Sequence, residues 1–314
     1  MEDISALKGL IGGFRQSRIL FTANNLRIFD FLNKPKSAKV ISAKLGTDTR
    51  ATSILLDALV SMGLIKKNGS LYENLPISSE YLQSGRPGYQ GDIISHFDTL
   101  WNNWSGLDNV VKTGSPNRKA ANHESFIRGM HNLSILKVKN VVDAIDLSDV
   151  RTAVDIGGGP GTYSIELAKR GIDVTLFDRP DTIAIAKEYA GSLANVKFIE
   201  GDFLVDPIGK GYDLAFISQV FHSYTTRENI MLLKKVKKSL NKKGKIAVQE
   251  FYIEDNMSEP LEGALFAVNM LVHTEGGRCY SVNEMQSWLS KSGFTEVATS
   301  RINEAVIINA QASG

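Results

Sequence analysis

The chain has 314 residues, 43% of them apolar, a formal net charge of +2 and a single cysteine, Cys279. Its length and apolar content predict two domains with a core in each, and its near-neutral charge gives no reason to expect a nucleic acid or a membrane as a partner. One cysteine excludes an intrachain disulfide and is typical of a reducing compartment. We expect a cytoplasmic protein, because the sequence opens without a signal-peptide pattern and its apolar runs are too short to span a bilayer.

Residues 1–85 are expected to form a winged-helix domain. Apolar residues recur at helical spacing through residues 4–32. Two more helices are predicted at residues 38–45 and 50–62, and residues 64–72 predict a β-hairpin closed by an Asn-Gly turn. Two helices followed by a hairpin are the elements of a winged helix.

A winged helix suggests DNA binding, which the composition of its second helix disfavours. Residues 50–62 carry one basic side chain, Arg50, and are otherwise rich in Ile, Leu and Val. A helix that reads a DNA groove presents basic and amide side chains instead. We therefore expect a dimerisation domain whose apolar surface is buried by a second copy of the chain, and no nucleic-acid partner.

Residues 86–148 are expected to be connecting helices that also contribute to the substrate pocket. The segment contains Trp104, and residues 126–142 predict one helical run that includes Phe126 and Met130. Aromatic and methionine side chains at helical spacing belong more often to a core than to a ligand site. Their position between two domains is the reason to consider ligand binding.

A glycine-rich turn follows a predicted strand at residues 153–156. Three consecutive glycines, Gly157 to Gly159, stand where the chain must turn sharply and let a ligand approach the backbone. A helix is predicted after the turn. Strand, glycine turn and helix form the nucleotide-binding unit of a doubly wound α/β sheet, which we assign to residues 149–314.

Two further predicted strands end in acidic residues. The strand at residues 173–177 ends in Asp178, where a carboxylate can accept hydrogen bonds from a ribose. The strand at residues 196–199 is followed by Asp202 and Phe203. Successive parallel strands therefore present these side chains along one edge of the sheet, which is where such folds bind ligands.

The fourth and fifth predicted strands bring a histidine and a glutamate to the same edge. The fourth strand runs into a segment that contains His222, and the capping-box spacing of Thr225 and Glu228 starts a helix directly after it. Residues 244–250 predict a fifth strand that ends in Glu250. A histidine on the ligand-binding edge of this sheet is a candidate general base.

Several motifs occur in a fixed order along nearly the whole chain. They are Gly13-Phe-Arg, Leu56-Asp-Ala-Leu-Val60, Gly63-Leu-Ile, residues 126–130, residues 154–161, Asp178-Arg-Pro180, Gly201-Asp-Phe203 and Gly276-Gly-Arg278. The acid Asp155 before the glycines and the Gly-Asp-Phe motif resemble class I S-adenosylmethionine-dependent methyltransferases rather than dinucleotide enzymes. The full set resembles, more narrowly, the two-domain small-molecule O-methyltransferases typified by plant caffeate and flavonoid enzymes and by bacterial polyketide-tailoring enzymes.

The resemblance implies S-adenosylmethionine (SAM) as the cofactor and assigns roles to individual residues. Asp178 would bind the ribose, and Asp202 and Phe203 would hold the adenine. His222 matches the family's general base, and Glu250 matches one of two glutamates that flank this histidine. The residues implied in cofactor binding are Asp155, Gly157, Gly159, Asp178, Arg179, Asp202, Phe203, Ser218 and Tyr224.

The implied reaction is methyl transfer to a hydroxyl of a small, aromatic acceptor in a homodimeric enzyme without a metal ion. A phenol with a pKa of about 10 is poorly ionised at neutral pH, whereas a histidine with a pKa of about 6.5 can accept its proton during attack. The expected substrate pocket consists of Trp104, Phe126, Met130, Phe266, Asn269, Met270 and His273.

Two departures from the family pattern leave alternatives open. Ser223 stands where the family has an aspartate, and Cys279 stands where it has the second flanking glutamate. Glu250 is then the one carboxylate partner expected for His222. C-methylation, a tailoring reaction without methyl transfer, and a SAM-sensing DNA-binding regulator are the alternatives to O-methylation.

Overall fold

The computed structural model describes residues 4–119 and 122–313. The chain divides into two compact units. The first comprises Met1–Trp101 and Ala121–Leu133, and the second comprises Asn102–Ala120 and Ser134–Gly314. The segment predicted to connect two domains, residues 86–148, is thus divided between the units.

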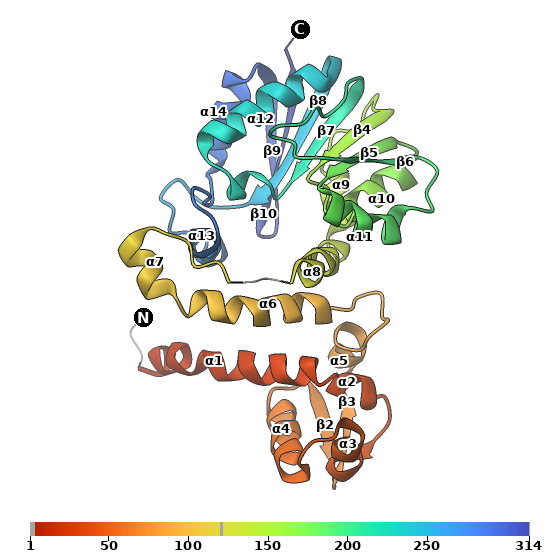
Figure 1. The fold of residues 1–314 in the computed structure, drawn as a ribbon, viewed down its shortest axis with the longest axis vertical. Coiled ribbons are helices and arrows are strands. Elements are labelled where there is room, and N and C mark those ends of the chain that lie inside the picture. Colours follow the sequence, from red (N-terminus) through yellow and green to blue (C-terminus); the bar gives the residue numbers. More distant parts are fainter. Residues whose placement is uncertain (1–3, 120–121, 314) are drawn as a thin grey trace. The chain divides into compact units, whose positions relative to one another are not determined.

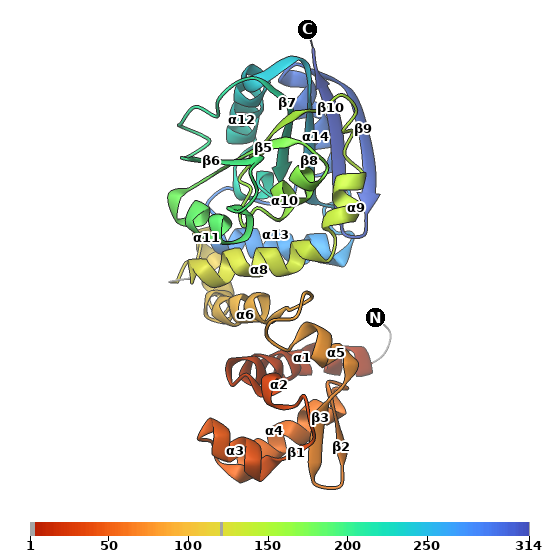
Figure 2. The ribbon, with the colours of Figure 1, turned by 90° about the vertical axis from the view of Figure 1, so that its right-hand side faces the viewer.

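The first unit contains helices and a three-stranded sheet. Its first elements are α1 (Ile4–Asn25), α2 (Ile28–Phe31), β1 (Lys36–Ser37), α3 (Ala38–Leu45), α4 (Thr49–Ser61), β2 (Ile65–Asn68), β3 (Leu71–Asn74) and α5 (Pro76–Tyr81). The side chains of Ser37 and Asp48 accept hydrogen bonds from backbone N–H groups in the first turns of α3 and α4, which fixes where these helices begin. Phe29, Leu56 and Tyr72 lie in the core of this unit. Helices α3 and α4 with the hairpin β2–β3 (Figure 2) form the predicted winged helix.

The predicted position of the hairpin turn is wrong by one residue. Asn68 pairs with Leu71, so Gly69 and Ser70 form the two-residue loop. Gly69 has a φ of +58°, which glycine adopts without the steric cost of a Cβ. A positive φ at the first loop position is typical of a type II′ turn, whose twist matches that of the flanking strands.

Four helices follow along the chain. They are α6 (Gly91–Trp104), α7 (Leu107–Thr113), α8 (His123–Ile135) and α9 (Val138–Asp143). The prediction of one helical run over residues 126–142 is wrong, because Lys137 leaves the helical conformation with a φ of −126°. The N–H of Lys137 bonds to the Ser134 carbonyl three residues back, and this tight turn ends α8. No helix in the described part of the chain is long and apolar enough to cross a membrane.

The second unit is built on a seven-stranded sheet. Its strands are β4 (Thr152–Ile156), β5 (Asp173–Asp178), β6 (Val196–Glu200), β7 (Tyr212–Ser218), β8 (Leu240–Phe251), β9 (Phe294–Ile302) and β10 (Ala305–Ala312). Their spatial order is β6-β5-β4-β7-β8-β10-β9. The first five strands in this order are parallel, and β10 is antiparallel to both of its neighbours. The strand predicted from residue 244 begins earlier, at Leu240.

Helices cover both faces of this sheet, as Figure 1 shows for α12 and α14 on one side and α10 and α11 on the other. The helices that follow β4 along the chain are α10 (Thr162–Lys169), α11 (Pro180–Ala190), α12 (Thr226–Ser239), α13 (Leu261–His273) and α14 (Val282–Lys291), with a 3₁₀ turn η1 at Phe221–Ser223. Side chains alternate between two cores: Val154 and Ile156 of β4 pack with residues of α12 and α14, whereas Ala153 packs with residues of α9 and α10. The predicted doubly wound α/β fold is confirmed.

The strand order predicts a ligand-binding edge at the carboxyl ends of the strands. The chain moves outward from β4 to β5 and β6 on one side, and to β7 and β8 on the other. The connections after β4 and β7 therefore diverge at a point where the strand order reverses, and open α/β sheets bind their ligands there. The ends of β4 to β8 are the positions at which the sequence predicts the site.

Candidate functional site

The turn after β4 requires glycine at successive positions. Gly157 and Gly159 have φ values of +68° and +55°, which side chains with a Cβ rarely adopt. A Cβ on Gly157 would lie 2.8 Å from Val220, and a Cβ on Gly158 would lie 2.9 Å from the carboxylate of Asp155. The turn is thus packed too closely for side chains at these positions, and its place at the strand end fits the cofactor cradle predicted there.

Asp155 lies fully buried beneath this turn. The Ser164 hydroxyl donates a 2.7 Å hydrogen bond to its Oδ2 atom. Burial raises the pKa of the Asp155 carboxyl to about 7, because a charge far from water is unfavourable. Asp155 therefore titrates near neutral pH next to the predicted cofactor site.

Asp178, at the end of β5, holds the glycine turn in place. Its Oδ2 atom accepts a 2.8 Å hydrogen bond from the Gly159 N–H, and its Oδ1 atom accepts a 2.7 Å bond from the Arg179 N–H. Burial raises the pKa of Asp178. Each carboxylate oxygen has a second lone pair, so Asp178 can still accept hydrogen bonds from a ribose. The Arg179 guanidinium is exposed and forms an ion pair with Asp181 at 3.6 Å.

The loop after β6 brings Asp202 and Phe203 to the same edge. The Leu204 N–H donates a 2.8 Å bond to Asp202 Oδ1, and the Asp202 N–H donates a 2.8 Å bond to Asp206 Oδ2. The ring of Phe203 packs edge-on against the ring of Tyr224, with centroids 5.5 Å apart. Acidic and aromatic side chains thus lie together, and this combination can bind the edge and the face of a purine base.

Ser218, at the end of β7, is tied to a buried amide. Its hydroxyl donates a 2.7 Å hydrogen bond to Gln249 Oε1 on the neighbouring strand β8. Gln249 is fully buried and directly follows the apolar residues Ile246–Val248 of that strand. No motif in the sequence points to Gln249, and its polar side chain directly after an apolar run is the one signal available there.

His222 and Glu250 form a hydrogen-bonded pair where β7 and β8 end. The His222 Nδ1 atom lies 2.8 Å from Glu250 Oε2, and both residues are at most 9% exposed. Glu250 Oε1 accepts a 2.7 Å bond from the Phe221 N–H. Because the carboxylate accepts at Nδ1, the imidazole carries its proton there, and its Nε2 lone pair is the one that can take up a proton.

Two aromatic rings lie beside this histidine. The ring of Phe266 on α13 stands perpendicular to the His222 imidazole, with centroids 4.8 Å apart, and stacks on the ring of Phe251 at 3.7 Å. Phe266 was predicted to bind substrate, whereas Phe251 was missed. Such rings restrict the rotation of the imidazole and provide a flat apolar surface.

The two residues that depart from the family pattern carry no negative charge in this structure. The Cys279 thiol is buried and donates a 3.2 Å hydrogen bond to the Gly263 carbonyl. Burial raises the pKa of this thiol to about 12, so it stays protonated at physiological pH. Ser223 is exposed to solvent. Glu250 is therefore the acid that accompanies His222.

Two predicted substrate-binding residues on α13, Asn269 and His273, contact residues at the end of α6. The Trp104 indole N–H donates a 3.1 Å bond to Asn269 Oδ1. The His273 Nδ1 atom lies 2.8 Å from the Asn269 carbonyl oxygen, and its Nε2 atom lies 3.0 Å from the amide of Asn103, a residue the sequence analysis missed. Burial lowers the pKa of His273 and favours its neutral form.

The other predicted pocket residues are distributed between the two units. Met270 is buried on α13. Phe126 and Met130 lie on the part of α8 that belongs to the first unit, so their membership of the pocket remains a prediction. The second unit by itself assembles Trp104, Phe266, Asn269 and His273 around the α13 helix.

Comparisons with known proteins identify the family of the chain. Residues 94–295 match the O-methyltransferase domain family, and residues 9–84 match the O-methyltransferase dimerisation domain. An acetylserotonin O-methyltransferase of Gallus gallus is 31% identical over 94% of this chain and 94% of its own length. A 3-hydroxy-5-methyl-1-naphthoate 3-O-methyltransferase of Streptomyces sahachiroi is 29% identical over 94% of this chain and 90% of its own length.

A solved structure agrees over the full length. Human N-acetylserotonin methyltransferase, crystallised in complex with SAM, is 26% identical and gives a TM-score of 0.92 over 100% of this chain and 99% of that one. The resemblance inferred from the sequence motifs is confirmed, as are SAM as the cofactor and methyl transfer as the activity. The chain therefore belongs to the SAM-dependent O-methyltransferases, enzymes that methylate small molecules, and it carries their dimerisation domain.

Proposed function

We propose that this enzyme methylates a hydroxyl group of a small aromatic molecule and that His222 is its general base. The observation that carries the proposal is the 2.8 Å contact between His222 Nδ1 and Glu250 Oε2 at the ligand-binding edge of the sheet. It fixes the tautomer in which Nε2 is free to accept a proton. The aromatic nature of the acceptor is supported by the rings of Phe251 and Phe266 beside the imidazole.

The chemistry requires little beyond this pair and correct positioning. Bound SAM supplies a methyl group on a sulfonium, which is a strong electrophile. His222 accepts the hydroxyl proton at Nε2 as the acceptor oxygen attacks, and Glu250 stabilises the imidazolium that forms. General-base assistance of this kind contributes about 10²- to 10⁴-fold to a rate.

The proposed cofactor site follows the strand ends from β4 to β7. The backbone at Gly157 and Gly159 would accommodate the methionine part of SAM beside Asp155, and Asp178 would accept hydrogen bonds from the ribose. Asp202 and Phe203 would hold the adenine. Arg179, Ser218 and Tyr224 complete the proposed set; burial and the carboxylate of Asp202 raise the pKa of Tyr224, which supports a position close to that acid.

The class of acceptor is supported by the residues around α13 and by the relatives. Trp104, Phe266 and Met270 offer aromatic and apolar surface, whereas Asn269 and His273 offer polar groups. The relative from Streptomyces sahachiroi is named for a hydroxynaphthoate, which is an aromatic acceptor. A pocket of flat apolar surface with few polar groups fits an aromatic ring that carries hydroxyl substituents.

The test is methyl transfer from labelled SAM to a panel of phenols, followed by substitution of the base. We expect His222→Ala to lower the rate at least about 10²-fold without weakening SAM binding. Ser223→Ala is the matched control, because the adjacent side chain is exposed. Unchanged turnover in His222→Ala would remove the assignment of the base, and an absence of transfer to every phenol would remove the aromatic acceptor.

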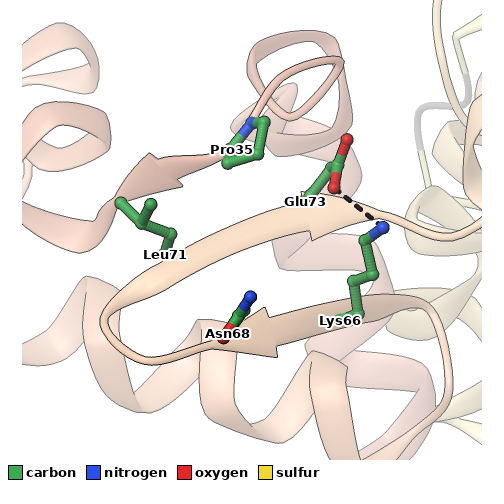
Figure 3. A pocket seen from close by; sticks show the side chains of 5 residues that line it. All are labelled: Pro35, Lys66, Asn68, Leu71 and Glu73. Atoms are coloured by element: carbon green, nitrogen blue, oxygen red, sulfur yellow. Dashed lines mark ion pairs between the residues drawn. The ribbon is translucent and has the colours of Figure 1, made fainter.

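A DNA-binding regulator is disfavoured by the pairing of charges on the hairpin. Lys66 forms a 2.9 Å ion pair with Glu73, and Lys67 forms a 2.6 Å ion pair with Asp57. A shallow hollow of about 180 Å³ on this hairpin is lined by Pro35, Lys66, Asn68, Leu71 and Glu73 (Figure 3). Its one basic and one acidic side chain neutralise each other, so the hollow offers no excess positive charge to a phosphate backbone.

The dimer predicted from the sequence is supported by the surface of α1. Leu10, Ile11 and Phe14 on this helix are between 57% and 68% exposed. Large apolar side chains in such a row are usually covered by a partner, and the matched dimerisation domain makes a second copy the proposed partner. Light scattering should give the mass of a dimer for the native chain and of a monomer for Leu10→Glu/Ile11→Glu. A native monomer would contradict this proposal.

A further inference from the structure

Lys235 joins helix α12 to the loop after β6. It lies near the end of α12, and its Nζ atom donates a 2.7 Å hydrogen bond to the backbone carbonyl of Phe203. The side chain is half-buried, and burial lowers the pKa of its ammonium. An ammonium that gives up part of its hydration needs compensating interactions, and this carbonyl supplies one.

Two carboxylates of the same loop affect the pKa of this ammonium. Asp206 and Asp202 both favour the charged form of Lys235. Asp206 in turn accepts the Asp202 N–H, and Asp202 accepts the Leu204 N–H. The loop after β6 thus closes on itself through its own acids, and Lys235 ties the closed loop to α12.

The loop also approaches the glycine turn. The Phe203 ring lies 3.5 Å from the position that a Cβ on Gly157 would take, and it packs against Tyr224. Holding the Phe203 carbonyl therefore fixes a ring that faces both the turn after β4 and the residue after η1. A small displacement of this loop would change the shape of the adenine site.

We propose that Lys235 is a positioning residue for the adenine end of the cofactor, acting by holding the Phe203 carbonyl. The inference rests on the proposed assignment of Asp202 and Phe203 to the adenine. Lys235 itself need not touch the cofactor. Its effect is on the affinity for adenosine-containing ligands and not on proton transfer at His222.

The chain offers a matched control for this proposal. Lys234 directly precedes Lys235 on α12 and is exposed to solvent. Lys235→Met and Lys234→Met remove the same charge from the same helix. Lys235→Arg keeps the charge and the ability to donate a hydrogen bond, and Lys235→Gln serves if the methionine variant does not fold.

The experiment measures the affinity of S-adenosylhomocysteine by calorimetry and that of adenosine by competition. We expect Lys235→Met to weaken both ligands about tenfold, because a hydrogen bond from a charged donor is lost. Lys235→Arg should restore both affinities to within about threefold of the native protein. Lys234→Met should bind both ligands as the native protein does. In turnover, the KM for SAM should rise while kcat changes little.

A further variant separates failure of this inference from failure of the proposed site. Asp202→Ala should weaken both ligands if the adenine lies at this loop. If Asp202→Ala binds normally, the adenine assignment is wrong and the role of Lys235 falls with it. If Asp202→Ala weakens binding but Lys235→Met does not, only the role of Lys235 is overturned. The same holds if Lys234→Met weakens binding as much as Lys235→Met does. A loss of affinity for S-adenosylhomocysteine without a loss of affinity for adenosine would also overturn the role of Lys235.

Discussion

The two parts of the candidate site in the second unit are held in different ways. At the strand ends, backbone N–H groups hold the carboxylates: Gly159 and Arg179 donate to Asp178, and Phe221 donates to Glu250. Around α13, the two contacts with α6 join side chain to side chain. Trp104 donates to Asn269, and Asn103 contacts His273.

This difference separates what the fold determines from what individual residues determine. Backbone donors stay in place whatever the neighbouring side chains are, so the edge proposed to bind the cofactor is a property of the sheet. A network of side chains changes with each substitution, so the surface around α13 can suit different acceptors. We therefore expect changes at the strand ends to affect the reaction with any acceptor, and changes around α13 to affect one acceptor at a time.

The largest effect is expected from Glu250→Gln. The carboxamide can keep its oxygen on the Phe221 N–H, but its NH₂ group then faces His222 Nδ1 and donates to it. The imidazole must then carry its proton on Nε2, where a base is needed, so transfer should fall by about 10² or more with every acceptor. Glu262→Gln, an exposed change on α13, is the control. Retention of full activity by Glu250→Gln would show that strand-end geometry does not govern the base.

A second effect concerns the pH dependence of stability at the same edge. The pKa of Asp155 rises from 3.8 to about 7 on folding. Between pH 4 and 7 the folded state binds a proton that the unfolded state has lost, so stability falls as the pH rises through this window. The carboxamide in Asp155→Asn does not titrate, so this variant does not lose stability in this way as the pH rises.

The measurement for Asp155 is denaturant unfolding at several pH values. Between pH 5 and pH 8 the free energy of unfolding of Asp155→Asn, relative to the native chain, should rise by roughly 3 kcal/mol. Asp173→Asn, at the exposed start of β5, should show no such trend. A constant difference between Asp155→Asn and the native chain would mean that Asp155 is ionised throughout this range.

The smallest effect is expected from Asn269→Leu on α13. The change removes the acceptor of the Trp104 indole N–H and one polar group of the proposed pocket. We expect the KM for the acceptor to rise about threefold to tenfold, the cost of one hydrogen bond, while the affinity for SAM stays the same. Leu265→Ala, an exposed change on the same helix, is the control. An equal loss of SAM affinity would break the distinction between the two parts of the site.

The sequence by itself determined the elements that depend on local chemistry. The glycine turn after β4 forms where the sequence predicts it, with positive φ at Gly157 and Gly159, and the capping box at Thr225 forms as its spacing predicts. Local rules were less accurate at the hairpin turn, where register and not the Asn-Gly pair selects the loop residues. They also failed at Lys137, where one tight turn divides a segment with continuous helical periodicity.

Only the tertiary structure decided which of these residues meet. His222 and Glu250 are 28 residues apart, and Trp104 and Asn269 are 165 apart, so no spacing rule predicts either contact. The first pair meets because β7 and β8 are parallel neighbours, which topology explains. The second pair and the bond from Lys235 to Phe203 depend on how helices pack against a loop or each other, and packing is set by the shapes of many side chains at once.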